Sequence, residues 1–291
     1  MAIDVVWFKR DLRIRDHAPL LAAASSGRPL LCLMLLEPTR MKQPDVDPIH
    51  LQWELDVAER LDRDLRRRGA ALHVVHADAV EAISSLHEKH AVHTVHAHEE
   101  TGVKWSYDRD RAVTSWCTKN GVEFVEHPNN GVIRRLQDRD GWKDARDARI
   151  AAPLLEAPFG LQGIPCEDSW PTLANAGLEA RVLQDRPEPG EVAALSLAHS
   201  FFEKRGEPYC WAMSGPVSAA LHASRLAPHL SVGSLSIRRV DAMAKARLDT
   251  LRSQRAAGAP VDGWIRSISA FRSRLAWHDH FIQKLEMQTS L

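Results

Sequence analysis

The chain has 291 residues, of which 44% are hydrophobic and 26% are charged, a composition typical of a globular protein of about two domains. Lysine plus arginine and aspartate plus glutamate both number 38, so the formal charge is zero and any contact with nucleic acid must come from a local patch. No apolar run approaches the roughly 20 residues that span a bilayer, and Asp4 breaks any signal-peptide pattern, so we expect no membrane contact and a cytoplasmic location.

The first half of the chain alternates short apolar runs with helical stretches, which is typical of a parallel α/β sheet. The predicted strands lie at residues 5–8, 30–36, 72–75, 92–96 and 122–125. Asp47 predicts the start of a helix that ends at Gly69. Asp78 and Glu81 predict a capping box for a second helix, and a third helix is expected near residues 104–120.

The loop after the first strand is unusually dense in charge. It carries Lys9, Arg10, Asp11, Arg13, Arg15 and Asp16. Open α/β sheets usually bind ligands at the carboxyl ends of strands, so these side chains are ligand candidates. We favour the alternative that they pair with one another and anchor the loop. No Gly-x-Gly-x-x-Gly and no P-loop follows a predicted strand, which argues against the usual dinucleotide and nucleoside triphosphate sites.

The histidines and cysteines predict no metal site. Among the clustered histidines at 90, 93, 96 and 98, only His96 and His98 share a face of a strand, and the sequence places no third matched ligand nearby. The four cysteines are scattered, and we expect free thiols.

Prolines become frequent after about residue 147, and helical periodicity returns near Val192. One helix is expected through 239–255, a Gly-Ala-Pro break follows, and a last helix begins near Gly263. We therefore predict three parts: an α/β domain (1–135), an extended interdomain linker (136–191) and an all-α part (192–291).

Two separate motifs resemble the photolyase/cryptochrome family. The run Val-Trp-Phe-Lys-Arg-Asp-Leu-Arg at 6–13 resembles that family's first strand and loop, and Ser-Arg-Leu at 224–226, with its flanking residues to 238, resembles its flavin-binding segment. The resemblance implies a Rossmann-like, HUP-type N-terminal domain followed by the start of an all-α FAD-binding domain. In the family that helical domain continues well beyond the position of Leu291, so we expect an incomplete FAD site.

The resemblance implies that Tyr209, Ser224, Arg225 and Leu226 contact FAD. A diphosphate is well bound by the amides and hydroxyl of a helix N-terminus beside a guanidinium group, which agrees with these residue types. Taken alone, the tripeptide at 224–226 is simply the start of a helix.

Four residues of the last predicted helix match positions that contact DNA in photolyases: Phe271, Arg274, Trp277 and His278. Trp277 matches the tryptophan that stacks on a flipped-out lesion. Arg274 stands where enzymes acting on cyclobutane dimers usually have glutamate, and His278 stands where they have arginine. The alternative is a helix whose aromatic residues pack in a core.

The function implied by the resemblance is a blue-light-dependent, FAD-containing DNA photolyase in an impaired form. Such an enzyme repairs UV-induced pyrimidine dimers by electron transfer from the excited reduced flavin, and we expect a monomer with UV-damaged DNA as its partner. The alternatives are a cryptochrome-like flavin photoreceptor without lyase activity and an inactive remnant. Residues 98–102 lie where relatives hold an antenna chromophore; its identity stays open, and an exposed helix start is the simpler interpretation.

Overall fold

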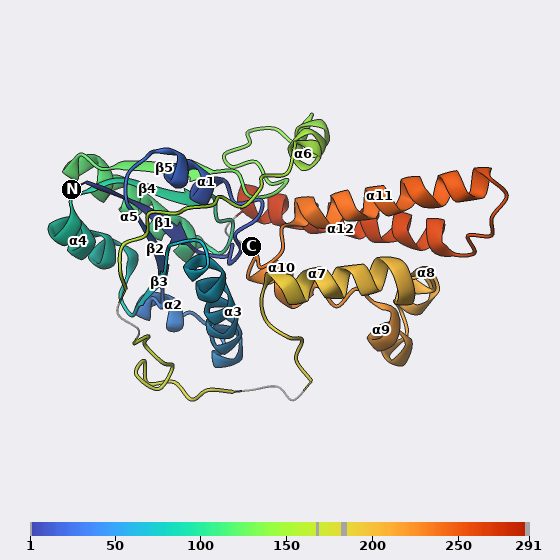
Figure 1. The fold of residues 1–291 in the computed structure, drawn as a ribbon, viewed down its shortest axis with the longest axis horizontal. Helices are drawn as coiled ribbons and strands as arrows, with labels where there is room; N and C mark the ends of the chain where they lie inside the picture. The colour runs from blue at the N-terminus through green and yellow to red at the C-terminus, as the bar shows by residue number, and fades with distance from the viewer. Residues whose placement is uncertain (1, 167–168, 182–184, 289–291) are drawn as a thin grey trace.

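The predicted strands form one parallel sheet in the order β3-β2-β1-β4-β5 (Figure 1). Their bounds are β1 Ile3–Phe8, β2 Leu30–Leu35, β3 Leu72–Val75, β4 Val92–His98 and β5 Glu123–His127, each within two residues of the expectation. The computed structural model describes residues 2–166, 169–181 and 185–288. Because the strand order reverses at β1, the carboxyl ends of β1 and β4 flank the switch point of the sheet.

Helices cover both faces of this sheet. They are α1 Ala18–Ser25, α2 Pro38–Met41, α3 Pro48–Arg66, α4 Ala79–His90 and α5 Lys104–Asn120. Side chains alternate along β1, so Val6 and Phe8 share a core with α1 and α3, whereas Val5 and Trp7 share the opposite core with α4 and α5. The parallel α/β class expected from the sequence is confirmed.

Two helices start where the sequence predicts, but only one of them has the predicted side-chain cap. The Asp47 carboxylate accepts a hydrogen bond from the Ile49 amide at 2.9 Å and caps α3 as expected. Asp78 precedes α4, but its carboxylate accepts hydrogen bonds from the amide and hydroxyl of Thr39 instead of from α4. The predicted capping box is therefore wrong, because a side chain distant in sequence recruits the acid.

The stretch 136–191 is more ordered than the predicted extended linker. It contains α6, Trp142–Ala151. Further on, Leu161 and Leu173 are buried in the core that lies under α3. The Ile164 amide donates to the Leu30 carbonyl at 2.9 Å, which attaches this stretch to the beginning of β2.

The remainder of the chain is helical, as predicted. It comprises α7 Glu191–Ser200, a π-helical turn η1 Phe201–Arg205, α8 Tyr209–Ala212, α9 Pro216–His222, α10 Ala227–Ser231, α11 Ile237–Ala256 and α12 Trp264–Met287. In Figure 1, α11 and α12 form a hairpin that extends away from the sheet. None of the described helices is both long and apolar enough to cross a membrane.

The loop between β1 and α1 joins the sheet to the helical part. Arg13 is buried and donates hydrogen bonds to the Gly233 carbonyl at 3.0 Å and to Asn129 Oδ1 at 2.9 Å. From the helical side, Arg238 donates to Asp16 Oδ1 at 3.0 Å. The loop is therefore anchored, but not by the predicted pairing of its charges with one another: the Asp16 carboxylate pairs with Arg238, and Arg13 reaches carbonyl and amide oxygens.

Residues 1–135 remain, by prediction, a unit able to fold alone, but a fragment of residues 1–180 will be more stable. The longer fragment keeps Leu161 and Leu173 in the core, and burying one such leucine contributes about 1.5–3 kcal/mol. Urea unfolding of both fragments checks this. Equal midpoints would show that residues 136–180 add nothing to the domain.

Candidate functional site

A polar cleft of about 260 Å³ lies at the switch point of the sheet. Lys9 and Arg10 follow β1 there, Glu100 follows β4, and His278 of α12 faces them from the helical part. The cleft therefore occupies the place where an open α/β sheet usually binds its ligand, and its wall is completed by the second part of the chain.

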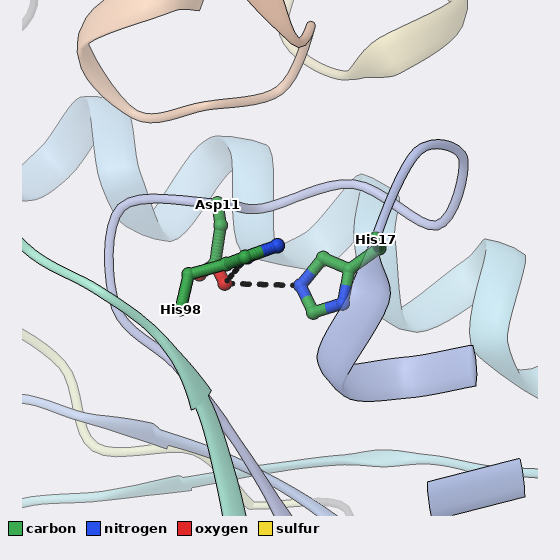
Figure 2. Close-up of side chains that lie close together, drawn as sticks. All are labelled: Asp11, His17 and His98. Atoms are coloured by element: carbon green, nitrogen blue, oxygen red, sulfur yellow. Dashed lines mark hydrogen bonds and ion pairs between the residues drawn. The ribbon is translucent and has the colours of Figure 1, made fainter. Parts of the chain in front are cut away.

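Three buried side chains meet beside this cleft: Asp11, His17 and His98 (Figure 2). His98 Nδ1 lies 2.7 Å and His17 Nε2 lies 3.0 Å from the same oxygen of Asp11. The other oxygen of Asp11 accepts a hydrogen bond from the Lys9 amide at 2.7 Å. Figure 2 shows both imidazole rings directed at the carboxylate from different elements.

The protons in this cluster can be assigned from its partners. His17 Nδ1 accepts a hydrogen bond from the Leu20 amide at the start of α1, so a neutral ring carries its proton on Nε2, towards Asp11. An ionised Asp11 only accepts, so His98 carries its proton on Nδ1. Its Nε2 is then an acceptor, without a hydrogen bond to any described residue, on a side chain that lines the cleft.

This cluster could not be recognised in the sequence because Asp11 and His17 are distant from His98 in the chain. The expectation that no third ligand lies near His98 is wrong, since the three ligand atoms are within 4.8 Å of one another. A metal ion would nevertheless have to displace the protons between the rings and Asp11 and break the hydrogen bond from Leu20 to His17. The arrangement is that of a hydrogen-bonded network, and the absence of a metal site stays a prediction.

The charges around the cleft are already paired. Lys9 Nζ lies 3.1 Å from Asp110, and Arg109 contacts Glu37, Glu100 and Asp110 at 2.7–2.9 Å. Burial alone would raise the pKa of Glu100, but Arg109, Arg10 and Lys9 lower it to about 2. An ionic network therefore borders the cleft, and within it Arg10, whose side chain is 47% exposed and lies 3.5 Å from Glu100, is more accessible than Lys9 or Arg109.

The predicted FAD residues lie around one region of the helical part but do not line the cleft. Tyr209 is 8% exposed, and its ring packs against those of Phe201 and Phe271. Leu226 is buried in the same core, whereas Arg225 is exposed in a left-handed conformation (φ 59°). Leu226, not Ser224, occupies the N-cap of the short α10, so the simple helix-start interpretation of Ser224 is wrong.

Arg205 is a residue of this region that the sequence analysis missed. Its guanidinium group donates to the carbonyls of Ala223 and Ser224, the latter at 2.6 Å. Burial, followed by repulsion from Arg225, lowers the pKa of Arg205. Within the described residues neither arginine pairs with a carboxylate, so the two guanidinium groups and the Ser224 hydroxyl suit a diphosphate.

The predicted DNA residues do not share one cavity. Phe271 is 4% exposed and contacts Phe201, Phe202 and Tyr209, so the core-packing alternative describes it. Trp277 is 50% exposed, and His278 faces the switch-point cleft. Six residues of helix turn the side chain by roughly 600°, which sends Phe271 and Trp277 to different faces of α12.

Trp277 lies in a second cleft, of about 510 Å³, between α6 and α12. Trp142, Lys143 and Arg146 line the α6 side, and Phe281 lies beside Trp277 on α12. The Arg274 guanidinium lies 4.4 Å from the centroid of the Trp277 ring. The α6 side of this cleft could not be expected from the sequence, since that helix falls in the predicted linker.

A family model described as DNA photolyase matches residues 4–151, slightly more than half of the chain. The chain belongs to the photolyase/cryptochrome family. It is 28% identical over 278 residues to a deoxyribodipyrimidine photo-lyase of Thermus thermophilus, covering 94% of this chain and 58% of that protein. It is 26% identical to cryptochrome DASH of Gloeobacter violaceus, covering 80% of this chain and 51% of that protein.

Three further proteins are similar to this chain over nearly its whole length. An uncharacterized 31.6 kDa protein of Synechococcus is 24% identical, with 95% of this chain and 98% of that protein covered. The solved cryptochrome of Synechocystis superposes with a TM-score of 0.79 at 20% identity, over 98% of this chain and 62% of that one. A class III photolyase of Agrobacterium tumefaciens gives a TM-score of 0.74 at 20% identity, over 99% and 60%. The structures establish the shared fold, and this chain spans about half to three fifths of most of these proteins.

The buried histidine–aspartate cluster will make stability depend on pH. Burial lowers the pKa of His17 and lowers that of His98 further, although Asp11 opposes both changes. In the unfolded chain both rings take up protons below about pH 6.5, but the folded protein resists this. The free energy of unfolding will therefore be highest above about pH 6.5 and will fall as the pH drops below that value.

Urea unfolding between pH 5 and 8 measures this dependence. His98→Gln will lower stability at pH 8 and flatten its loss on acidification, whereas His50→Gln, at an exposed position, will leave the curve unchanged. Identical pH profiles for the two variants would contradict the assignment.

Proposed function

We propose that this chain carries the α/β domain and the first flavin-domain helices of a light-dependent, FAD-containing DNA photolyase that repairs pyrimidine dimers. The single observation that supports DNA contact is the half-exposed Trp277 in a cleft of nucleotide size with aromatic and cationic neighbours. A dimer is already poorly stacked in the duplex, so it leaves the helix at reduced cost and regains stacking energy on an aromatic ring.

The residues of the α6–α12 cleft have separable roles in this proposal. Trp277 stacks on the flipped base, and Phe281, 62% exposed, extends the apolar wall. Lys143, whose side chain is 80% exposed, lies 3.2 Å from Asp147 and would exchange this partner for a phosphate. Arg146 binds Asp279 at 2.9 Å and fixes α6 against α12, which sets the width of the cleft.

The FAD part of the proposal depends on Arg205, Ser224 and Arg225. These residues fit a diphosphate, and Leu226 and Tyr209 support them from the core below. FAD, when bound, supplies light absorption and the transfer of a single electron. The described residues around Ser224 would hold the diphosphate and orient the cofactor.

A cryptochrome-like photoreceptor is the second candidate, and the position of Arg274 favours it. Its guanidinium covers the Trp277 ring, so a lesion would have to displace this cation before stacking. Loss of dimers from an irradiated oligonucleotide under blue light supports the photolyase. Flavin absorbance without repair supports the photoreceptor. A protein that shows neither flavin absorbance nor repair supports the inactive remnant.

We further propose that the switch-point cleft binds the antenna chromophore, with His98 Nε2 accepting a hydrogen bond from it. Support comes from the position of the cleft at the carboxyl ends of β1 and β4 and from the oriented His98 ring. A cytoplasmic, monomeric protein is the simplest setting for this activity.

Trp277→Ala will weaken binding of an oligonucleotide containing a dimer by about tenfold or more, because stacking on an aromatic ring contributes about 1–3 kcal/mol per base. Fluorescence anisotropy measures the dissociation constant. Phe159→Ala removes an 83%-exposed aromatic ring elsewhere and will change nothing. An unchanged constant for Trp277→Ala would leave this tryptophan without a role in DNA binding.

Arg225→Gln will weaken FAD binding by about tenfold, since a charge-assisted hydrogen bond contributes about 1.5–3 kcal/mol. Titration of the purified protein with FAD, followed by flavin fluorescence, measures this. Arg255→Gln is the matched control at another exposed arginine. Equal FAD affinities for the two variants would place the diphosphate elsewhere.

A further inference from the structure

One ring of the buried histidine–aspartate cluster stands back from the cleft. His17 is 1% exposed and is not among the described residues that line the switch-point cleft, whereas Asp11 and His98 are. The His17 ring packs against those of Phe8 and His98, with centroid distances of 4.7 Å and 4.5 Å. A ring enclosed in this way can influence a ligand in the cleft only through its neighbours.

The first turn of α1 determines which nitrogen of His17 carries a proton. His17 is the N-cap of α1, and its Nδ1 accepts a hydrogen bond from the Leu20 amide at 3.1 Å. Burial lowers the pKa of His17, so the ring is neutral at neutral pH. Since an amide can only donate, the single proton of this ring lies on Nε2, which is 3.0 Å from the Asp11 carboxylate.

Asp11 transmits this constraint to His98. One oxygen of Asp11 accepts a hydrogen bond from the Lys9 amide at 2.7 Å, and the other oxygen is shared by His17 and by His98 Nδ1. Burial alone would raise the pKa of Asp11, but His17 and His98 lower it well below its ordinary range, so the carboxylate is ionised. A lone pair on His98 Nδ1 would face this anion, and the proton of His98 therefore lies on Nδ1.

We propose that His17 is a positioning residue for the switch-point cleft: through Asp11 and through ring contact it holds His98 with an unprotonated Nε2 available to the cleft. The cleft therefore takes a ligand that presents an N–H or O–H group to His98. It rejects a ligand that presents an acceptor there, because two facing acceptors in a buried site both lose their hydrogen bonds to water.

The proposal rests on the proposed function only in taking this cleft as the place where a chromophore binds. The tautomer of His98 is a property of the chain alone, set by the groups that surround the ring, and can be measured without a ligand. The two can therefore fail separately.

The contribution of His17 can be separated from that of Asp11. Without His17, the Asp11 carboxylate keeps only one side-chain donor, so burial raises its pKa and favours the protonated acid. A protonated Asp11 donates to His98 Nδ1, which leaves the proton of a neutral His98 ring on Nε2. Loss of His17 will therefore reverse the direction of the hydrogen bond that His98 offers to the cleft.

The test is heteronuclear NMR of the full chain with isotope-labelled histidine rings at neutral pH. Protonated and unprotonated ring nitrogens have well-separated chemical shifts, and the signals of His98 are those that disappear in His98→Gln. In the unaltered protein, Nδ1 of His98 will be protonated and Nε2 will not.

Three substitutions of His17 distinguish positioning from helix capping. His17→Gln keeps an acceptor for Leu20 and a donor for Asp11, so the His98 signals will stay as in the unaltered protein. His17→Ser keeps the cap but is too short to reach Asp11, and His17→Met fills the space without a hydrogen bond. In both of these variants the His98 signals will shift towards the tautomer with its proton on Nε2.

His73→Met is the matched control. It removes a partly buried histidine on the edge strand β3, whose Nε2 lies 3.3 Å from the Ile164 carbonyl. This variant will leave the His98 signals unchanged. Circular dichroism identifies the variants that fold, and either His17→Ser or His17→Met is sufficient for the decision.

Ligand selectivity is measured with lumiflavin, a flavin ring whose imide N–H donates a hydrogen bond, and with its N3-methyl derivative, which lacks this donor. Neither probe carries the diphosphate on which the proposed FAD site depends. The unaltered protein and His17→Gln will bind lumiflavin about tenfold more tightly than the methyl derivative, as expected for one hydrogen bond. In His17→Ser and His17→Met the two affinities will become equal.

Four outcomes would overturn the proposal. They are a proton on Nε2 of His98 in the unaltered protein, unchanged His98 signals in a folded His17→Ser or His17→Met variant, altered His98 signals in His73→Met, and equal affinities of the unaltered protein for the two flavins. If neither flavin binds, the antenna proposal fails, whereas the role of His17 is decided by the nitrogen signals.

Discussion

The arrangement of the whole chain depends on the buried guanidinium group of Arg13. Its donors reach the carbonyls of Gly233 and Asp16 and the amide oxygen of Asn129, so one side chain joins β1, the β5 loop and the helical part. Gly233 has φ 65°, and a Cβ there would lie 2.1 Å from the Arg10 carbonyl, so only glycine lets the segments approach this closely. A buried cation with satisfied donors gives the junction a fixed geometry, since any displacement would leave charge desolvated and unpaired.

That fixed junction explains why both candidate sites lie where they do. The loop that ends in Arg13 also carries Lys9, Arg10 and Asp11, so anchoring it places the floor of the switch-point cleft. The Asp11 carboxylate then sets the orientation of His98. At the second cleft, Arg146 and Asp279 set the spacing of α6 and α12. In each case a buried ion or hydrogen-bonded pair positions a more accessible group that is free to meet a ligand.

The sequence was sufficient for the sheet and for most helices because apolar periodicity and caps such as Asp47 are local signals. It was insufficient where a long-range partner decides the outcome. Asp78 turns to Thr39 and not to its own helix, His17 and Asp11 meet His98 only in the folded chain, and α6 arises in a stretch read as extended. The candidate residues on α12 and around Ser224 could be named from the sequence. The helix face that each of them occupies could be known only from the fold, because Phe271 enters the core, whereas Trp277 does not.

The attachment of residues 161–164 to β2 has a consequence for solubility. Strand β3 begins to pair only at Cys32, so without that attachment the first residue of β2, Leu30, would present free amide and carbonyl groups beside apolar side chains. The Leu30 amide instead donates to the Gln162 carbonyl, and its carbonyl accepts from Ile164, so the peptide completes the edge. An open edge of this kind invites pairing with a strand of another molecule. Residues 161–164 therefore also hinder pairing of this edge with a strand of another molecule.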